Sequence, residues 1–274
     1  MTTHALLNGA TRLIGIIGDP IAQVKSPATV SRIMQEQGRH TVCVPLHVSA
    51  AQFDACVQGA GTVQNLDGLI ATVPHKFAMR RACATVTERA AFLGVVNIAR
   101  RNVDGSWHGD MLDGAGFVAA ARAAGCNPHG KRALMAGAGG AGTAIAYALL
   151  DAGVTALAIH DSDTARRDAL IAQLSQRFAG RVRAGSHDPH GFDVIVNATP
   201  MGMRAGDPLP FDAARLTASM FAGDVITLPD VPPLLAAARA AGCTTQTGTA
   251  MSLKVCEMMV AFLLEAQGSQ EAAR

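Results

Sequence analysis

The stretch RALMAGAGGAGTAIAYALLD, residues 132–151, decides the fold of this chain. An apolar run of strand length, Arg132–Ala136, leads into glycines at positions 137, 139 and 142, which match the pattern G-x-G-x-x-G, and a helical pattern follows. In this order, a glycine turn lets backbone N–H groups approach a pyrophosphate at the positive end of the helix. The alternative is a tight turn packed on glycine. The predicted cofactor contacts are Gly137, Ala138, Gly139, Gly140, Ala141 and Gly142.

Strand-length apolar runs and amphipathic stretches alternate along the rest of the chain. This order is typical of α/β proteins, with parallel sheets and helices on both faces. The expected strands are Leu13–Ile17, Thr41–Leu46, Gly68–Val73, Val95–Arg100, Arg132–Ala136, Ala156–His160, Asp193–Ala198 and Asp224–Leu228. The expected helices are Pro27–Gln37, Gly116–Ala124, Ile145–Asp151, Ala165–Phe178, Pro233–Ala241 and Ala250–Ala266.

Glycines at 109, 114 and 116 surround a helix start and indicate a domain boundary near Asp110–Gly116. The dinucleotide-binding unit follows this boundary, and the last helix comes after the last strand of that unit. That helix can pack back on the first domain. We therefore predict a discontinuous α/β domain, residues 1–113 and 247–274, and a Rossmann domain, residues 114–246.

The composition excludes several classes of protein. Of the 274 residues 49% are hydrophobic and 16% are charged, which excludes a disordered chain. A net charge of +2 with 4% aromatic residues argues against nucleic-acid binding. Six scattered cysteines, no leader pattern and no long apolar run predict a cytoplasmic protein with reduced thiols and no membrane span. His187 and His190 lack a third ligand, so no metal is expected.

Asp161 ends the strand after the glycine turn, 19 residues beyond Gly142. A carboxylate at this place accepts hydrogen bonds from ribose hydroxyls and repels the extra phosphate of NADP by roughly 4 kcal/mol at about 4 Å. The sequence therefore predicts NAD as the preferred cofactor. Arg166 and Arg167 would offset part of this repulsion if they turned inward, but solvated positions in a first helical turn are the expected arrangement.

The loop Asn197-Ala198-Thr199-Pro200-Met201 follows another apolar strand of the same unit. Loops at the carboxyl ends of such strands line the nicotinamide site. Asn197, Thr199 and Met201 are therefore candidate cofactor contacts, and an ordinary turn is the alternative.

Lys76 lies where the strand Gly68–Val73 passes into a helical stretch. The positive end of a helix disfavours the charged ammonium, and a lysine with a lowered pKa can take a proton from an alcohol near neutral pH. Asp113 is a carboxylate that could orient such a lysine. The alternative for each is a surface charge at a helix start. His75, beside Lys76, is either a substrate contact or a residue of the helix start.

The order of several further motifs resembles the shikimate dehydrogenase family over almost the whole chain. The motifs are Gly18-Asp19-Pro20-Ile21-Ala22, Lys25-Ser26-Pro27, Thr72-Val73-Pro74-His75-Lys76, Val96-Asn97, Gly109-Asp110 with Asp113-Gly114, Asn197–Met203 and Pro233-Leu234-Leu235. The resemblance implies a substrate domain and a Rossmann domain with a cleft between them, in a monomer or a homodimer. It also implies reversible oxidation of a ring hydroxyl of shikimate or quinate. Lys76 and Asp113 resemble the family's catalytic pair, and Ser26, Thr72 and Asn97 resemble its substrate contacts.

Departures from the family pattern concentrate among the substrate contacts. The family's serine is replaced by Val24 and its tyrosine by Thr227, while Glu257 aligns with its glutamine. Ile70 and Met111-Leu112 replace an asparagine and an Asn-Thr pair, and His160-Asp161-Ser162 replaces the Asn-Arg-Thr at the 2′-phosphate. Each lost hydrogen bond to a charged carboxylate costs about 1.5–3 kcal/mol, so shikimate should bind poorly. Neutral drift with repacking is the alternative.

Three functions remain open from the sequence. The first is an NAD-dependent oxidoreductase of this family that oxidises a ring hydroxyl of a cyclic polyol or hydroxy acid. The second is shikimate or quinate dehydrogenase itself. The third is a non-catalytic dinucleotide-binding ligand sensor, which would have no need of Lys76 and Asp113.

Overall fold

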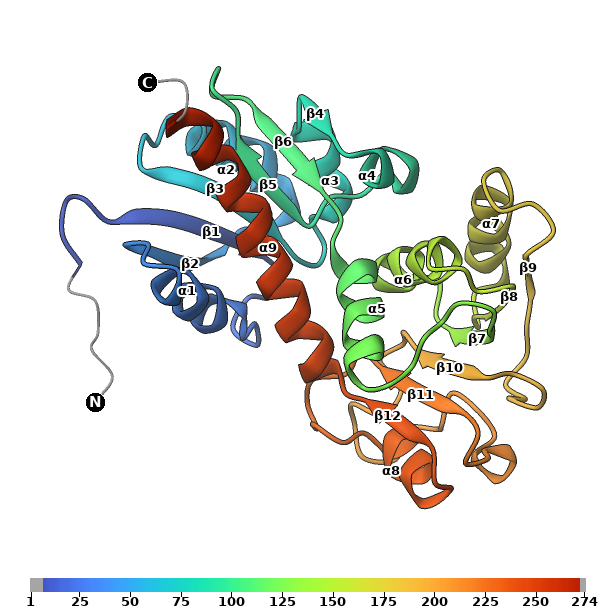
Figure 1. Ribbon diagram of the computed structural model, residues 1–274. Coiled ribbons are helices and arrows are strands. Elements are labelled where there is room, and N and C mark those ends of the chain that lie inside the picture. Colours follow the sequence, from blue (N-terminus) through green and yellow to red (C-terminus); the bar gives the residue numbers. More distant parts are fainter. Residues whose placement is uncertain (1–6, 272–274) are drawn as a thin grey trace, which may run out of the picture. The chain divides into compact units, whose positions relative to one another are not determined.

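The computed structural model describes residues 7–271, which form two compact units (Figure 1). The first unit contains the residues up to Leu112 and those from Cys256 onward, and the second is Asp113–Val255. The first division lies within the segment Asp110–Gly116 that the sequence indicated. The chain returns to the first unit inside the last helix, α9 (Gly248–Glu271), where the second part of that unit begins at Cys256. The sequence predicted this boundary at residue 247.

The first unit is built on a six-stranded sheet in the order β2-β1-β3-β5-β6-β4. Its strands are β1 (Arg12–Gly18), β2 (Thr41–His47), β3 (Leu66–Ala71), β4 (Thr85–Val86), β5 (Ile98–Arg101) and β6 (Trp107–Asp110). β5 is antiparallel to both β3 and β6, so the prediction of a parallel sheet is wrong here. The physical reason is the tight turn between β5 and β6, in which Asn102 and Ser106 pair and Gly105 has φ +84°. So short a connection joins only antiparallel strands.

Helices cover both faces of this sheet. They are α1 (Ser26–Glu36), α2 (Phe53–Ala60), α3 (Lys76–Ala82), α4 (Glu88–Leu93) and the later part of α9; a short 3₁₀ turn, Ala50–Gln52, precedes α2. His108 stacks on Phe262 of α9 with ring centroids 5.7 Å apart. Its neighbour Trp107 lines a cavity together with residues of α2. Because successive residues of a strand point to opposite faces, α9 and α2 lie on opposite sides of the sheet.

The second unit has a six-stranded sheet in which every pair of neighbouring strands is parallel. Its strands are β7 (Arg132–Ala136), β8 (Ala156–His160), β9 (Val182–Ala184), β10 (Val194–Asn197), β11 (Phe221–Asp224) and β12 (Thr244–Gln246). The spatial order β9-β8-β7-β10-β11-β12 corresponds to 3-2-1-4-5-6, the order of the Rossmann fold. The strand expected at Asp224–Leu228 is placed too late, because β11 pairs with β10 and β12 over Phe221–Asp224 and the chain then leaves the sheet.

The helices of the second unit are α5 (Asp113–Ala123), α6 (Gly140–Asp151), α7 (Thr164–Ser175), α8 (Pro233–Ala240) and the start of α9, with a 3₁₀ turn at Ala213–Arg215. α5 and α6 pack closely, because a Cβ on Gly114 would lie 2.0 Å from the carbonyl oxygen of Ala144. Buried Leu134, Ile195, Ala222 and Leu235 belong to one core cluster beneath α8. The carboxyl ends of β7, β10 and β11 lead into loops.

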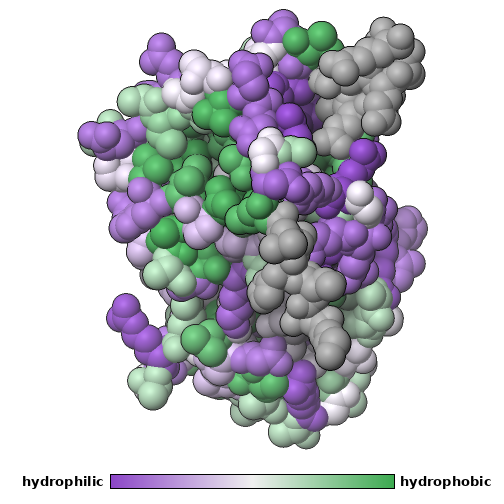
Figure 2. Space-filling model, turned by 90° about the vertical axis from the view of Figure 1, so that its left-hand side faces the viewer, coloured by the Kyte–Doolittle hydropathy of each residue, from purple (hydrophilic) through white to green (hydrophobic). Residues whose placement is uncertain are grey.

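No helix within residues 7–271 has the length and apolar composition of a membrane span. On the face shown in Figure 2, hydrophobic side chains form patches among hydrophilic ones. All six cysteines lie within the described residues, and none forms a disulfide.

Candidate active site

The glycine turn after β7 can accommodate only glycine at two of its positions. Gly137 has φ +102°, and a Cβ on it would lie 2.6 Å from the carbonyl oxygen of Ala198. A Cβ on Gly142 would lie 2.1 Å from the carbonyl oxygen of Gly137. Gly139 differs, because a Cβ there meets nothing within 4 Å. The turn therefore brings the loop after β7 against the loop after β10, where the strand order reverses.

The first turn of α6 is open to an anion. Gly139 occupies the N-cap position and supplies no side-chain hydrogen bond to the helix. The first N–H groups of a helix have no partner within the helix and carry its positive dipole end. The open space beside Gly139 and the uncapped helix end fit the pyrophosphate of a dinucleotide.

Asp161 follows β8 and is 7% exposed. Its Oδ2 accepts the N–H of Ala138 at 2.7 Å, and its Oδ1 accepts the N–H of Asp163 at 2.9 Å. Arg166 donates from Nη2 to Oδ1 at 2.8 Å. A carboxylate offers about four acceptor positions, so these three hydrogen bonds leave about one acceptor position unfilled.

The position of Arg166 corrects the expectation of a solvated side chain. Its guanidinium turns toward Asp161 and stays 51% exposed. Arg167 also departs from the expected solvated position, because it pairs with Asp168 on the same helix and keeps only 19% of its side chain exposed. Burial opposes ionisation of Asp161, but hydrogen bonds from Arg166, Ala138 and Asp163 outweigh it and lower the pKa of the carboxyl. The carboxylate is therefore ionised, and part of its charge is balanced by a neighbour.

Asn197, at the end of β10, organises the loop that follows it. Its Oδ1 accepts hydrogen bonds from the N–H of Thr199 at 3.0 Å and from the Oγ1 of Thr199 at 2.6 Å. Its Nδ2 donates to the carbonyl oxygen of Met201 at 3.1 Å and to Oδ2 of Asp224 at 3.0 Å. The side chain is fully buried and its amide is saturated. Asn197 therefore shapes the loop from inside, and Thr199 and Met201 form its surface.

Asp224, at the end of β11, was not among the residues predicted from the sequence. Its side chain is fully buried, accepts from Asn197, and accepts the N–H of Ile226 at 2.9 Å. Burial raises the pKa of Asp224 to about 6, although its hydrogen bonds act in the opposite direction. An aspartate at the carboxyl end of an apolar strand could have pointed to this residue. The predicted strand began at Asp224 instead of ending there, so the position of Asp224 was not recognised.

Lys76 is the first residue of α3 and is half-buried. Its carbonyl oxygen accepts the N–H of Val96 at 3.0 Å, which ties the start of α3 to the segment carrying Asn97. Val73, three residues before Lys76, and Phe77, directly after it, are both exposed. His75 is 1% exposed, stacks on Phe53 at 4.9 Å between centroids, and places Nε2 2.7 Å from the carbonyl oxygen of Val48. His75 is therefore part of the core.

Asn97 and Asp113 are connected through the chain between them. Oδ1 of Asn97 accepts the N–H of Leu112 at 2.9 Å, and Asp113 follows as the first residue of α5. Asn97 is 1% exposed and Asp113 is 9% exposed. Asp110, which precedes this segment, is buried and pairs with Arg89.

The remaining predicted substrate residues of the first unit differ in exposure. Val24, Ser26, Thr72 and Glu257 are half-buried. Thr72 lies beside the end of β1, because a Cβ on Gly18 would lie 2.5 Å from its Cγ2. The apolar replacements Ile70, Met111 and Leu112 are at most 4% exposed. In the second unit, Thr227 is half-buried in the loop after β11.

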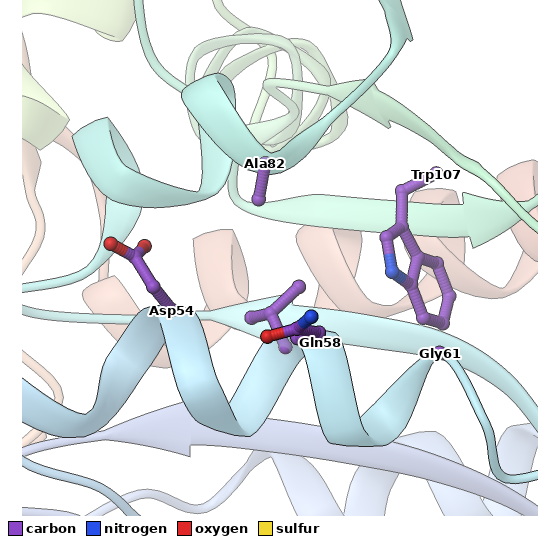
Figure 3. Close-up of a pocket in the computed structure, with 6 residues that line it drawn as sticks. Asp54, Gln58, Gly61, Ala82 and Trp107 are labelled. Carbon is purple, nitrogen blue, oxygen red and sulfur yellow. The ribbon is translucent and has the colours of Figure 1, made fainter.

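A shallow cavity of about 320 Å³ lies in the first unit, apart from these residues. Figure 3 shows Trp107 extending from β6 toward Gly61, with Asp54 and Gln58 on α2 and Ala82 on α3. None of the predicted site residues lines it. Within the described part of the chain, no group of three His, Cys, Asp or Glu side chains is arranged to hold a metal ion.

A 3-2-1-4-5-6 parallel sheet with an uncapped glycine turn at its switch point defines a dinucleotide-binding protein. Residues 16–99 match the family model described as the shikimate dehydrogenase substrate binding domain. The chain is 38% identical to shikimate dehydrogenase (NADP(+)) of Rubrobacter xylanophilus over 90% of this chain and 88% of that protein. The chain belongs to the shikimate dehydrogenase family, whose members are NAD(P)-dependent oxidoreductases.

The solved structures that share this fold include a quinate dehydrogenase and a ketofructose reductase. Quinate dehydrogenase from Corynebacterium glutamicum in complex with NAD is 31% identical, with a TM-score of 0.81 and coverage of 94% of this chain and 99% of that one. The 5-ketofructose reductase of Gluconobacter sp. strain CHM43 is 29% identical, with a TM-score of 0.86 and coverage of 93% of each chain. The relatives therefore include proteins named for NADP, for NAD and for different substrates.

Proposed function

We propose that this protein is an NAD-preferring oxidoreductase that oxidises a secondary hydroxyl of a cyclic polyol or hydroxy acid, reversibly and with little activity on shikimate. Family membership supports the reaction class. The observation that carries the finer proposal is the replacement of polar substrate contacts by Val24 and Thr227, while Lys76, Asp113, Ser26, Thr72 and Asn97 are retained.

The residues of the second unit would hold the cofactor. The open N-terminus of α6 and the glycine turn would bind its pyrophosphate, Asp161 its adenosine ribose, and Thr199 and Met201 the nicotinamide side. Bound NAD(P) supplies the hydride acceptor and donor. Gly137 and Gly142 support this assignment, because side chains at either position would collide with the loop backbone.

Lys76 would take up the proton that leaves the substrate hydroxyl, at its Nζ, and return it in the reverse direction. Asp113 would orient Lys76 as a carboxylate. Two retained proton-transfer residues count against a non-catalytic ligand sensor.

Of the two proposed substrate classes, the polyol fits the altered contacts better, because it has no carboxylate. Val24 cannot donate the hydrogen bond that a serine gives to a carboxylate, and Thr227 does not extend as far as a tyrosine. The loss of one hydrogen bond to a charged group costs about 1.5–3 kcal/mol. The similar 5-ketofructose reductase is named for a ketose, which has no carboxylate. Shikimate or quinate dehydrogenase remains the second candidate, because relatives with those names cover most of the chain.

Asp161 supports a preference for NAD, since one of its acceptor positions remains for a ribose hydroxyl. Arg166 reduces this preference, because it balances the carboxylate and keeps its guanidinium half-exposed. We therefore propose that NAD is preferred and that NADP is still used.

The decisive experiment follows NADH or NADPH fluorescence with a panel of polyols, ketoses, shikimate and quinate. Turnover of an uncharged polyol or ketose with NAD(H), well above that of shikimate, is the expected result. Efficient use of shikimate, with kcat/KM above about 10⁴ M⁻¹s⁻¹, would favour the second candidate instead. Cofactor binding without turnover of any member would favour the sensor.

A further inference from the structure

Asp110 is a buried carboxylate three residues before Asp113. It ends β6 and is 1% exposed. Arg89 of α4 contacts it with two nitrogens: Nε donates to Oδ1 at 2.7 Å, and Nη2 donates to Oδ2. The hydroxyl of Thr87 also donates to Oδ1. A two-pronged contact between a guanidinium and a carboxylate fixes orientation as well as charge.

The same carboxylate holds the backbone that leads to Asp113. Oδ1 of Asp110 accepts the N–H of Met111 at 2.7 Å. The backbone carbonyl oxygen of Asp110 accepts the N–H of Asn97 at 2.9 Å. Asn97 in turn accepts the N–H of Leu112 at 2.9 Å. Both peptide N–H groups between Asp110 and Asp113 are therefore bound by side chains rather than by a strand or helix partner.

A buried ion pair is a poor source of stability, because the cost of removing two charges from water offsets most of their attraction. Arg89 keeps 36% of its side chain exposed, whereas Asp110 is almost fully enclosed. What this pair provides at this position is a fixed geometry for the peptide N–H of Met111, next to Leu112, whose N–H is held by Asn97.

We propose that Asp110, held by Arg89, is a positioning residue that orients Asp113 for the reaction by fixing the two peptide groups before it. The inference rests on the proposed function only in that Asp113 takes part in the chemistry. The effect on the backbone can be measured without any turnover.

Asp110→Asn removes the charge and the matched oxygen pair with almost no change in volume. Arg89→Lys keeps the positive charge and removes the two-pronged contact with Asp110. Because the side chain of Arg89 is partly exposed, this variant is the alternative if Asp110→Asn does not fold. The matched control is Asp67→Asn. Asp67 accepts from Nε of Arg12 at 3.0 Å and from Nη2 of Arg12, so the same pair joins β1 to β3 in the same unit.

The first measurement is hydrogen exchange of the segment 107–116 in the full chain. Asp110→Asn and Arg89→Lys should raise exchange at Met111 by about tenfold or more, because Oδ1 of Asp110, which accepts its N–H, is neutralised or displaced. Exchange at Leu112, whose N–H is accepted by Asn97, should rise less. Asp67→Asn should leave this segment unchanged. Unchanged exchange at Met111 and Leu112 in both test variants would overturn the proposal.

The second measurement is kinetics, with wild type and Lys76→Ala assayed alongside. If wild type turns over substrate and Lys76→Ala does not, the proposed function holds, and Asp110→Asn should lower kcat about tenfold or more with the NADH affinity unchanged. Asp67→Asn should lower the melting temperature by a similar amount and leave kcat near the wild-type value. Equal loss of kcat in Asp110→Asn and Asp67→Asn would reduce Asp110 to a structural role. Absence of wild-type turnover refutes the proposed function alone, and exchange then decides about Asp110.

Discussion

Arg166 donates a 2.8 Å hydrogen bond to the carboxylate of Asp161, five residues earlier in the chain. The contact joins the residue expected to select NAD to a cation that could receive the additional phosphate of NADP. Under the proposed function, the choice between NAD and NADP depends on the balance between these two neighbouring charges of opposite sign.

Removing Asp161 and removing Arg166 should shift the preference between NAD and NADP in opposite directions. Asp161→Ala should narrow the ratio of kcat/KM for NAD to that for NADP by about tenfold or more, which corresponds to about 1.4 kcal/mol. Arg166→Ala should widen the ratio. Arg167→Ala is the matched control, because Arg167 pairs with Asp168 at 2.8 Å on the same helix. A wild-type preference for NADP would refute the role assigned to Asp161.

Two glycines of the same turn should respond differently to alanine. Gly142→Ala should lower the free energy of unfolding by about 1–3 kcal/mol, since its Cβ would meet backbone at 2.1 Å. Gly139→Ala should fold normally, because its Cβ meets nothing within 4 Å, and should weaken NADH binding by intruding on the pyrophosphate position. Thermal melts and NADH titrations distinguish these effects. Normal NADH affinity in Gly139→Ala would argue against the pyrophosphate position.

Loss of the proton acceptor should affect turnover more than cofactor binding. Lys76→Ala should lower kcat by about 10²–10⁴-fold, the usual contribution of a general base, and Asp113→Asn should have a similar effect. Lys131→Ala removes an exposed lysine and should be neutral. Near-normal turnover in Lys76→Ala would exclude this residue from the mechanism.

Restoring the family's residues should recover shikimate as a substrate. Val24→Ser with Thr227→Tyr should raise kcat/KM for shikimate about tenfold or more, because one hydrogen bond to a charged carboxylate contributes about 1.5–3 kcal/mol. The gain should appear mainly in KM. Val103→Ser, at a residue that is 89% exposed, is the control. An unchanged KM would mean that these positions do not select the substrate.

Burial of Asp224 predicts a pH dependence of stability. Its pKa is about 6 in the folded protein and near 4 in the unfolded chain, so between these values the folded state retains a proton that the unfolded state has released. Stability from this group is complete below about pH 4 and is lost as pH rises through about 6. From pH 4.5 to 7.5 the wild type should lose about 2 kcal/mol relative to Asp224→Asn in denaturant titrations. A constant difference across this range would contradict the raised pKa.

Several features could be predicted from local pattern alone. The glycine spacing after an apolar strand predicted a glycine turn, because the positive φ of Gly137 and the close approach of Gly142 to the carbonyl of Gly137 both arise within the turn itself. The alternation of strands and helices predicted the α/β class, confirmed by the two sheets. Short elements such as β4, β9 and α4 were missed, since two to six residues carry too little periodicity.

The sequence by itself determined the fold class, the dinucleotide-binding turn and the family, because each depends on residue types at fixed spacing. Tertiary structure alone decided the partners of individual side chains. It turned Arg166 toward Asp161, placed His75 in the core, buried Asn197 inside its loop, and joined Arg89 to Asp110 across 21 residues. These outcomes depend on where rotatable side chains find hydrogen-bond partners after the strands have paired, and neither composition nor spacing encodes that.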